Sequence, residues 1–223
     1  MFYTYVPVKP ASTQARLLDA AESLFSERGF QGISIREITD QADANLAAVN
    51  YHFGSKAGLM KALIERQIGP LNQLRIEELD AAEAAAGEQP LPIDSLLRIF
   101  FTAPIRHFHK PGQKLPNLLA RLHQDPSPEV VEVVVSVFQP IADRFLTALH
   151  RSAPHLSEAQ LITRAMFMKG AMVHAMSDGL ILASAMTEGR VSMDDPEELI
   201  EELVQFCTEG FRLHTPNSGP PAE

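Results

Sequence analysis

The 223-residue sequence contains one cysteine and no tryptophan. A lone Cys207 excludes an internal disulfide and favours a reducing compartment, and its place in an apolar helical segment indicates a packing role. No apolar run approaches the ~18 residues that a membrane-spanning helix needs. Residues 1–10 lack the basic start and apolar core of a signal peptide. These absences predict a soluble, cytoplasmic protein.

The sequence also lacks the common signatures of catalysis and metal binding. It has no Gly-rich phosphate loop, no Gly-x-Ser-x-Gly elbow and no His-x-x-x-His pair. His107 and His109 are two residues apart, which places them on different faces of a helix, and we interpret them, with His123 and His174, as surface or pocket-edge residues. We therefore expect no enzyme, no cofactor and no metal site.

Positive charge is scarce, and the deficit is uneven along the chain. The formal net charge is -9, with 19 basic and 28 acidic residues. Residues 1–66 hold seven of each kind, so the acidic excess lies entirely in residues 67–223. An acidic body behind a neutral head would direct the head toward phosphate. Few cations are available to displace counterions, which predicts modest non-specific affinity for DNA.

The stretch from Ser34 to Lys56 predicts two short helices joined by a tight turn. Ser34 and Glu37 are spaced as a capping box, and Ile35, Ile38 and Ala42 then share one helical face. Asp43 stands at the turn, where a left-handed backbone is required and Asp is tolerated.

Asn45 is a good N-cap for the second helix, whose inner face we assign to Leu46, Val49 and Phe53. The side chains left toward solvent suit a helix that enters a DNA groove. They are Ala47, Ala48, Asn50, Tyr51 and His52.

Residues Asn45 to Lys56, ending in Tyr51-His52-Phe53-Gly54-Ser55-Lys56, resemble the recognition helix and following turn of the TetR family of repressors. Residues 17–30 resemble the first helix of that family. The sequence departs from the family at Asp43, where Gly is usual.

The resemblance implies a DNA-binding domain over residues 11–71, with the helix-turn-helix at 34–53. Tyr51, His52 and Lys56 would hold the phosphate backbone, while Asn45 or Asn50 would pair with adenine. The expected DNA-binding residues are Ser34, Arg36, Asn45, Leu46, Ala47, Ala48, Asn50, Tyr51, His52 and Lys56.

The apolar period predicts helices through the rest of the chain and an all-α fold. A first helix begins at Ser12 or Thr13 and ends near Arg28 before Gly29, and a long one runs from Ser55 to about Ala86 with a kink at Pro70. Residues 130–135 are rich in valine, but they lie within a longer helical period. Later helices are expected at 93–109, 115–123, 127–152, 157–186 and 195–213. We assign residues 72–213 to effector binding and dimerisation, residues 214–223 to a disordered tail, and leave open whether residues 1–11 contact DNA.

The body resembles the fatty-acid-responsive branch of the family called PsrA-like. The resemblance is carried by residues 118–121, 125–129, 138–145, 154–157 and 194–197. It implies control of fatty-acid metabolism by a long-chain fatty acid or acyl-CoA.

A methionine-rich helix over residues 161–186 is adaptable enough to line an apolar pocket, although it could equally form the core or a dimer seam. Among the cations near apolar runs, Arg98, Arg106, Arg121 and Lys169, we prefer Arg121 as the anchor of an acidic ligand. The expected effector-binding residues are Phe101, Ile105, Phe108, Leu118, Arg121, Leu122, Phe138, Met168, Met172 and Met176.

The last helix carries two apolar stripes, which a second copy of the chain would cover. The expected dimerisation residues are Met166, Leu199, Leu203, Phe206 and Phe211. We therefore expect a homodimer that binds a palindromic operator on double-stranded DNA and is released by a small apolar effector. An all-α carrier or enzyme using the methionine-lined cavity, or an interaction scaffold, is the alternative.

Overall fold

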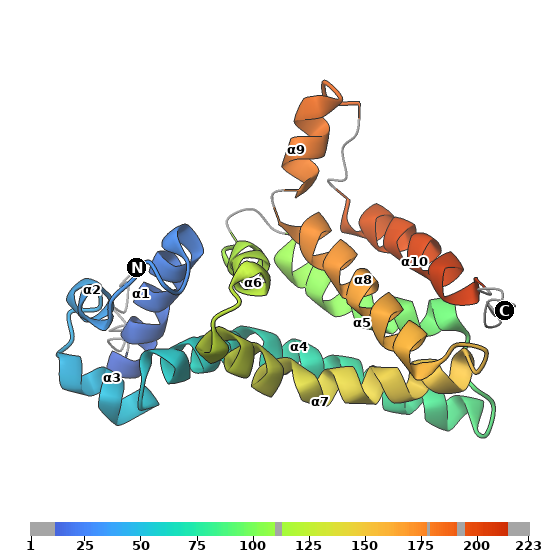
Figure 1. Cartoon of the computed structure of the whole chain (residues 1–223), viewed down its shortest axis with the longest axis horizontal. Coiled ribbons are helices and arrows are strands. Elements are labelled where there is room, and N and C mark those ends of the chain that lie inside the picture. Colours follow the sequence, from blue (N-terminus) through green and yellow to red (C-terminus); the bar gives the residue numbers. More distant parts are fainter. Residues whose placement is uncertain (1–11, 110–112, 178, 191–194, 214–223) are drawn as a thin grey trace, which may run out of the picture.

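The computed structural model describes residues 12–109, 113–177, 179–190 and 195–213, and all the regular structure in these ranges is helical. The helices form a small head and a larger body joined by one long helix (Figure 1). Their bounds are α1 Thr13–Arg28, α2 Ile35–Gln41, α3 Leu46–Phe53, α4 Lys56–Ala86, α5 Ile93–Phe108, α6 Leu115–Gln124, α7 Pro128–Ser152, α8 Glu158–Met176, α9 Gly179–Met186 and α10 Pro196–Arg212.

Local capping and turn residues determine the ends of the helices in the head. Ser12 caps α1, and Gly29 ends it with a positive φ of 72°. Ser34 and Glu37 form the expected capping box at the start of α2. Asp43 adopts the expected left-handed backbone, with φ 47°, in the turn before α3. Caps and the left-handed turn therefore determine where α2 ends and α3 begins.

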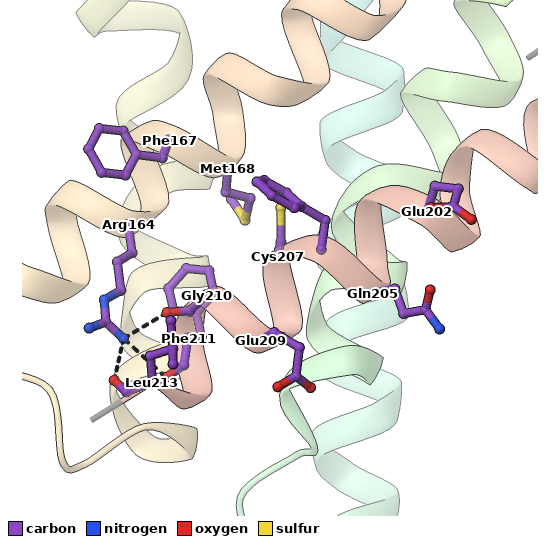
Figure 2. A pocket seen from close by; sticks show the side chains of 11 residues that line it. Arg164, Phe167, Met168, Glu202, Gln205, Cys207, Glu209, Gly210, Phe211 and Leu213 are labelled. Carbon is purple, nitrogen blue, oxygen red and sulfur yellow. Dashed lines mark hydrogen bonds between the residues drawn. The ribbon is translucent and has the colours of Figure 1, made fainter. Parts of the chain in front are cut away.

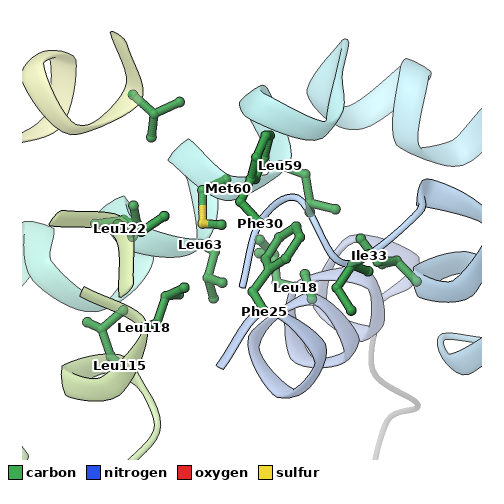
Figure 3. Packing of buried hydrophobic residues seen from close by; sticks show 14 of the residues in the cluster. Leu18, Phe25, Phe30, Ile33, Leu59, Met60, Leu63, Leu115, Leu118 and Leu122 are labelled. Atoms are coloured by element: carbon green, nitrogen blue, oxygen red, sulfur yellow. The ribbon is translucent and has the colours of Figure 1, made fainter. Parts of the chain in front are cut away.

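The hydrophobic core of the head extends beyond its own three helices. Phe25 and Phe30 pack in one cluster with Leu63 of α4, and α6 contributes Leu118 and Leu122 to the same cluster (Figure 3). Burying a leucine side chain is worth roughly 1.5–3 kcal/mol. The helix α6 therefore contributes to the stability of the head as well as to the body.

A second cluster forms the body between α4, α5, α7, α8 and α10. The helices α5 and α10 lie side by side and are joined at their surface by two ion pairs, Arg98 with Glu201 and Arg106 with Glu197. The helix α9 projects from the body (Figure 1). No helix among the described residues is both long and apolar enough to span a membrane.

The helix expected over residues 157–186 is divided in two, so that expectation was wrong. Helix α8 ends at Met176, and Ser177 turns to an extended backbone while its hydroxyl donates to the carbonyl of His174 at 3.0 Å. Serine competes in this way for backbone partners, and the Gly179 that follows favours a break. Elsewhere the expected bounds agree with the structure within two residues, and the valine-rich segment is helical. Helix α4 continues through Pro70. The arm 1–11 and the tail 214–223 lie outside the described residues.

Candidate functional site

The outer face of α3 is the first candidate site. Tyr51 is 84% exposed and Leu46 is 56% exposed, while Val49 is buried in the core of the head. Leu46 therefore does not lie on the inner face that we assigned to it, although it stays available to DNA. Ala48, expected toward solvent, is half-buried and packs against the core, whereas Ala47 is exposed.

Some polar side chains of this face already form hydrogen bonds within the protein, and others are exposed. Asn45 accepts a hydrogen bond through Oδ1 from the Ala48 N–H at 2.9 Å, so capping occupies that oxygen. Asn50 and His52 are exposed. The structure therefore favours Asn50 over Asn45 for reading a base edge.

Arg16 of α1 holds the turn between α2 and α3, a role that sequence analysis missed. Its Nε donates to the Ala42 carbonyl at 2.9 Å, and its Nη2 donates to the Asp43 carbonyl at 3.0 Å. The side chain is half-buried. The signal available in the sequence was a cation at the start of α1, one position before the buried Leu17 and Leu18.

Lys56 and the capping box flank the recognition helix. The ammonium of Lys56 lies 4.2 Å from the centroid of the Phe30 ring, and burial lowers the Lys56 pKa. The pKa of Glu37 is lowered to about 2, chiefly because the Ser34 N–H donates to it, and further by Arg28. Arg36 is exposed on α2. The residues expected to contact DNA thus border α3, on α2, α3 and the start of α4.

A small interior cavity in the body is the second candidate site. It has a volume of about 70 Å³ and lies between α4, α5, α6, α7 and α8. Most of its lining is apolar, but three basic side chains also line it: Arg75, His123 and Lys169. A groove of about 320 Å³ between α7 and α8 shares Phe100, Ala142 and Lys169 with the cavity.

Arg75 is the unusual residue of the cavity, and sequence analysis did not select it. It is 3% exposed. Its Nη1 donates to Oδ1 of Asn72 at 3.0 Å, its Nη2 lies 3.8 Å from the sulfur of Met172, and its Nε has no partner among the described residues. The guanidinium carbon lies 4.4 Å from the centroid of the Phe100 ring.

The structure brings only some of the expected effector-binding residues to this site. Phe138, Met172 and Met176 line the cavity, and Met168 lines the adjoining groove. Arg121 is exposed on the surface of α6, away from the position expected for a ligand anchor. The remaining expected residues are buried within the two hydrophobic clusters, and these are Phe101, Ile105, Phe108, Leu118 and Leu122.

An exposed apolar face on α8 and α10 is the third candidate site. Phe206 is 73% exposed and Phe167 is 70% exposed, and both line a surface groove of about 660 Å³ (Figure 2). Met166 is also exposed on α8, where it lines the groove between α7 and α8. The guanidinium of Arg164 donates to the carbonyls of Gly210, at 2.7 Å, and Leu213, at 2.9 Å, which ties α8 to the end of α10.

The other three residues expected at a dimer interface lie inside the subunit. Leu199, Leu203 and Phe211 are buried in the body cluster against neighbouring helices. The two apolar stripes of α10 are therefore covered within the chain to a greater extent than the sequence suggested. Phe206 stands out from them as the exposed member.

An N-terminal helix-turn-helix with an exposed recognition helix, attached to a larger helical body, is the arrangement of a DNA-binding regulator. Residues 17–63 match the family of bacterial regulatory proteins called the tetR family, and residues 98–210 match a tetracyclin repressor-like C-terminal domain. The chain therefore belongs to the TetR family and is a DNA-binding transcriptional regulator. Because this is a family of regulators and not of enzymes, the enzyme alternative is excluded.

Individual relatives match different parts of the chain. The HTH-type transcriptional repressor BdcR of Escherichia coli (strain K12) is 26% identical over 161 residues, 71% of this chain and 76% of that protein. A Bacillus subtilis (strain 168) protein described as "Probable HTH-type transcriptional regulator YttP" is 43% identical over 53 residues. Those residues are 24% of this chain, and they span about a quarter, 26%, of that protein.

Solved structures share the whole fold at low identity. The regulator FadR from Bacillus subtilis, in complex with stearoyl-CoA, superposes with a TM-score of 0.61 over 87% of this chain and 97% of that chain. The sequence identity is 14%. The likeness extends through head and body, and at this identity it establishes the fold alone.

Proposed function

We propose that the chain acts as a homodimeric repressor that binds a palindromic operator and leaves it when an apolar small molecule enters the body. The effector class that we favour is a long-chain fatty acid or its CoA thioester. The runner-up is a different apolar or aromatic effector acting through the same switch. The relative BdcR is named a repressor, which supports repression over activation.

The effector class is supported by the lining of the body and by the structural neighbours. Phe138, Met172 and Met176 give the cavity an adaptable apolar wall, because methionine side chains are flexible and polarisable. FadR from Bacillus subtilis, with the same fold, holds stearoyl-CoA. The resemblance of the body to the PsrA-like branch supports the same class.

The helix α6 is the observation that carries the switch, because it touches both the cavity and the head. Leu119 and His123 of α6 line the cavity, while Leu115 and Leu118 pack in the core of the head. Lys114, just before α6, also donates to the hydroxyl of Ser23 in α1 at 2.9 Å. A ligand that displaces α6 would therefore move the head directly.

The helix α4 supplies a second connection along the same path. It begins at Lys56, directly after the recognition helix, and reaches the cavity at Ile68 and Arg75. The two heads of a dimer need recognition helices about 34–36 Å apart to enter successive major grooves. A small shift of α4 in each subunit would change that spacing and disfavour the operator.

The exposed apolar face of α8 and α10 is the surface that we assign to dimerisation. Phe167 and Phe206 are large apolar side chains exposed in its groove, and Met166 is exposed on α8 at the groove toward α7. Monomeric proteins seldom leave large apolar patches in water, and a twofold axis would let the same face cover itself.

The switch obeys thermodynamic linkage, which makes it testable from either site. An effector shifts the equilibrium only by its difference in affinity between the operator-bound and released forms, and each ~1.4 kcal/mol changes the ratio tenfold. Operator DNA must then weaken effector binding by the same factor.

The test begins by selecting an operator from random duplexes and then titrating C8 to C18 acids and their CoA thioesters into the complex. Release of DNA by members of this series supports the proposal. Release by aromatic or cationic compounds alone would favour the runner-up. Absence of sequence-selective DNA binding would reject the regulatory function itself.

A further inference from the structure

We propose that the interior cavity is a receptor for the carboxylate of an apolar acid, with Arg75 as the ion-pair partner and Lys169 at the entrance. This inference deepens the proposed function and rests on it, since the acid is taken to be the effector. It also chooses between the two favoured effectors, because it selects the free acid over the thioester.

The first support is that Arg75 is a buried charge without a counter-charge. Its described contacts are an amide oxygen of Asn72, the sulfur of Met172 and the ring face of Phe100. A thioether is a weak acceptor, and Nε has no partner among the described residues. Arginine is almost never fully buried unless it is paired, because an unpaired buried charge is costly. A carboxylate bound here would give the Arg75 guanidinium the charged acceptor that its described contacts do not supply.

The second support is the charge of the whole lining. Arg75, His123 and Lys169 line the cavity together with apolar side chains, and no Asp or Glu is among the described lining residues. Burial alone lowers the pKa of Arg75, to about 9, and also lowers the pKa of Lys169, with no carboxylate acting on either. Arginine side chains stay protonated at neutral pH in proteins, so Arg75 carries a charge. The cavity therefore holds uncompensated positive charge that suits a single anionic group.

The third support is the shape of the adjoining space. The groove between α7 and α8 meets the cavity at Phe100, Ala142 and Lys169, and its lining is predominantly apolar. An acid lying with its hydrocarbon chain in this groove would place its carboxylate at the cationic end. Guanidinium binds carboxylate through two parallel hydrogen bonds, and Arg75 has a free Nε to offer.

A CoA thioester fits this arrangement less well than a free acid. The thioester replaces the carboxylate by a neutral group, so the end of the chain that would reach Arg75 carries no charge. The phosphates of CoA are distant from the acyl carbon. A methyl ester of the same chain length tests this difference, because it keeps the apolar chain and replaces the carboxylate by a small neutral group.

The test compares Arg75→Met with Arg121→Met, which changes an exposed arginine of α6 by the same substitution. Dodecanoic acid, its methyl ester and its CoA thioester are titrated by calorimetry into the full-length protein without DNA. We expect Arg75→Met to weaken acid binding by about 10- to 100-fold, the range for a hydrogen-bonded charge pair, and to leave the ester unchanged. Arg121→Met should bind all three ligands like the unaltered protein.

A second variant guards against misfolding. Arg75→Lys keeps the charge and loses the planar donor fork, so its loss of acid affinity should be smaller than that of Arg75→Met. Equal acid affinity in the unaltered protein and Arg75→Met would overturn the proposal, as would ester or thioester binding as tight as the acid. If the ester or the thioester still releases the operator, the proposed regulatory function remains supported. If the protein binds no operator, that function is rejected independently of Arg75.

Discussion

Arg16 donates a hydrogen bond to the backbone carbonyl of Asp43 at 3.0 Å, so the first helix of the head grips the turn that orients the recognition helix. Asp43 itself holds a left-handed backbone, with φ 47°. The turn is thus fixed by a long-range contact and by one strained residue. The TetR family usually places glycine at this position, and the chain meets the same backbone requirement with aspartate.

Substitution at Asp43 should separate backbone strain from side-chain contacts. We expect Asp43→Gly to change the free energy of unfolding by less than ~0.5 kcal/mol, because relief of strain offsets the added freedom of the unfolded chain. Asp43→Val should cost about 1–2 kcal/mol, since a β-branched residue is strongly disfavoured at positive φ. Thermal unfolding measures both, with Asp40→Val in α2 as the control. Equal destabilisation by Gly and Val would contradict the backbone explanation.

Asn50 should determine part of the operator sequence. Its side chain is exposed on α3, and asparagine pairs with adenine through two hydrogen bonds in the major groove. We expect Asn50→Ala to lose about 1–3 kcal/mol at one base pair and to relax the preference there. Selection of bound sites from random duplexes measures this base preference. Gln73→Ala on α4 is the control. An unchanged preference would argue against this placement of α3.

Lys56 should contribute to phosphate binding without sequence preference. Lys56 is the first residue of α4 and follows the end of the recognition helix closely. Its ammonium lies over the ring of Phe30. We expect Lys56→Ala to weaken binding to all duplexes alike and to lower the slope of log affinity against log salt by about 1. Lys61→Ala, one turn further along α4 and paired with Glu65, should leave the slope unchanged. A loss restricted to one operator would exclude a phosphate contact.

Glu37 should make the head sensitive to acid. Its folded-state pKa of about 2 lies below the ordinary value of 4.5, so its contribution is fully present above about pH 4.5 and is lost as the pH falls toward about 2. Glu37→Gln keeps the capping geometry but removes the charge. We expect this variant to show a weaker pH dependence of stability in that window, measured by circular dichroism. Glu65→Gln controls for net charge, and identical acid profiles would refute the assignment.

The proposed dimer should depend on Phe206. Introducing a charge with Phe206→Glu in the exposed face of α10 is expected to yield a monomer in light-scattering measurements. Operator affinity should fall by about 100-fold or more, because two heads no longer bind as a linked pair. Val131→Lys alters an exposed apolar residue of α7 and serves as the control. A dimer that survives Phe206→Glu would place the interface elsewhere.

The parts of the fold that sequence analysis predicted are those with local causes. The bounds of α1, α2 and α3 follow from caps such as Ser34 and Asn45, which act within four residues. The break after Met176 was missed because Ser177 is a weak signal within an apolar stretch. Local sequence signals predict helix ends, but they do not predict which distant helices pack together.

The candidate site depended on such distant packing, and so it was predicted less well. Arg121 has apolar neighbours in the sequence but is exposed in the structure. Arg75 lies seven residues after Ile68 and four before Leu79, both buried, so it occupies a buried position of the helical repeat. That register was a usable signal. The tertiary fold determines which helices cover Arg75. It also determines that the described lining of the cavity contains no carboxylate.

The leucines of α6 also limit how the head of this protein can be exchanged for the head of a relative. A cut after residue 71 would keep α1, α2 and α3 but would strip Leu115, Leu118 and Leu122 from the core that they share. Folded domains have only about 5–15 kcal/mol of net stability, so losing three buried leucines is a large fraction of it. Grafting a head from one relative onto the sensor of another therefore requires α6, or a matching surface for it, to travel with the graft. Retargeting a biosensor built on this chain is better done by redesigning the exposed face of α3.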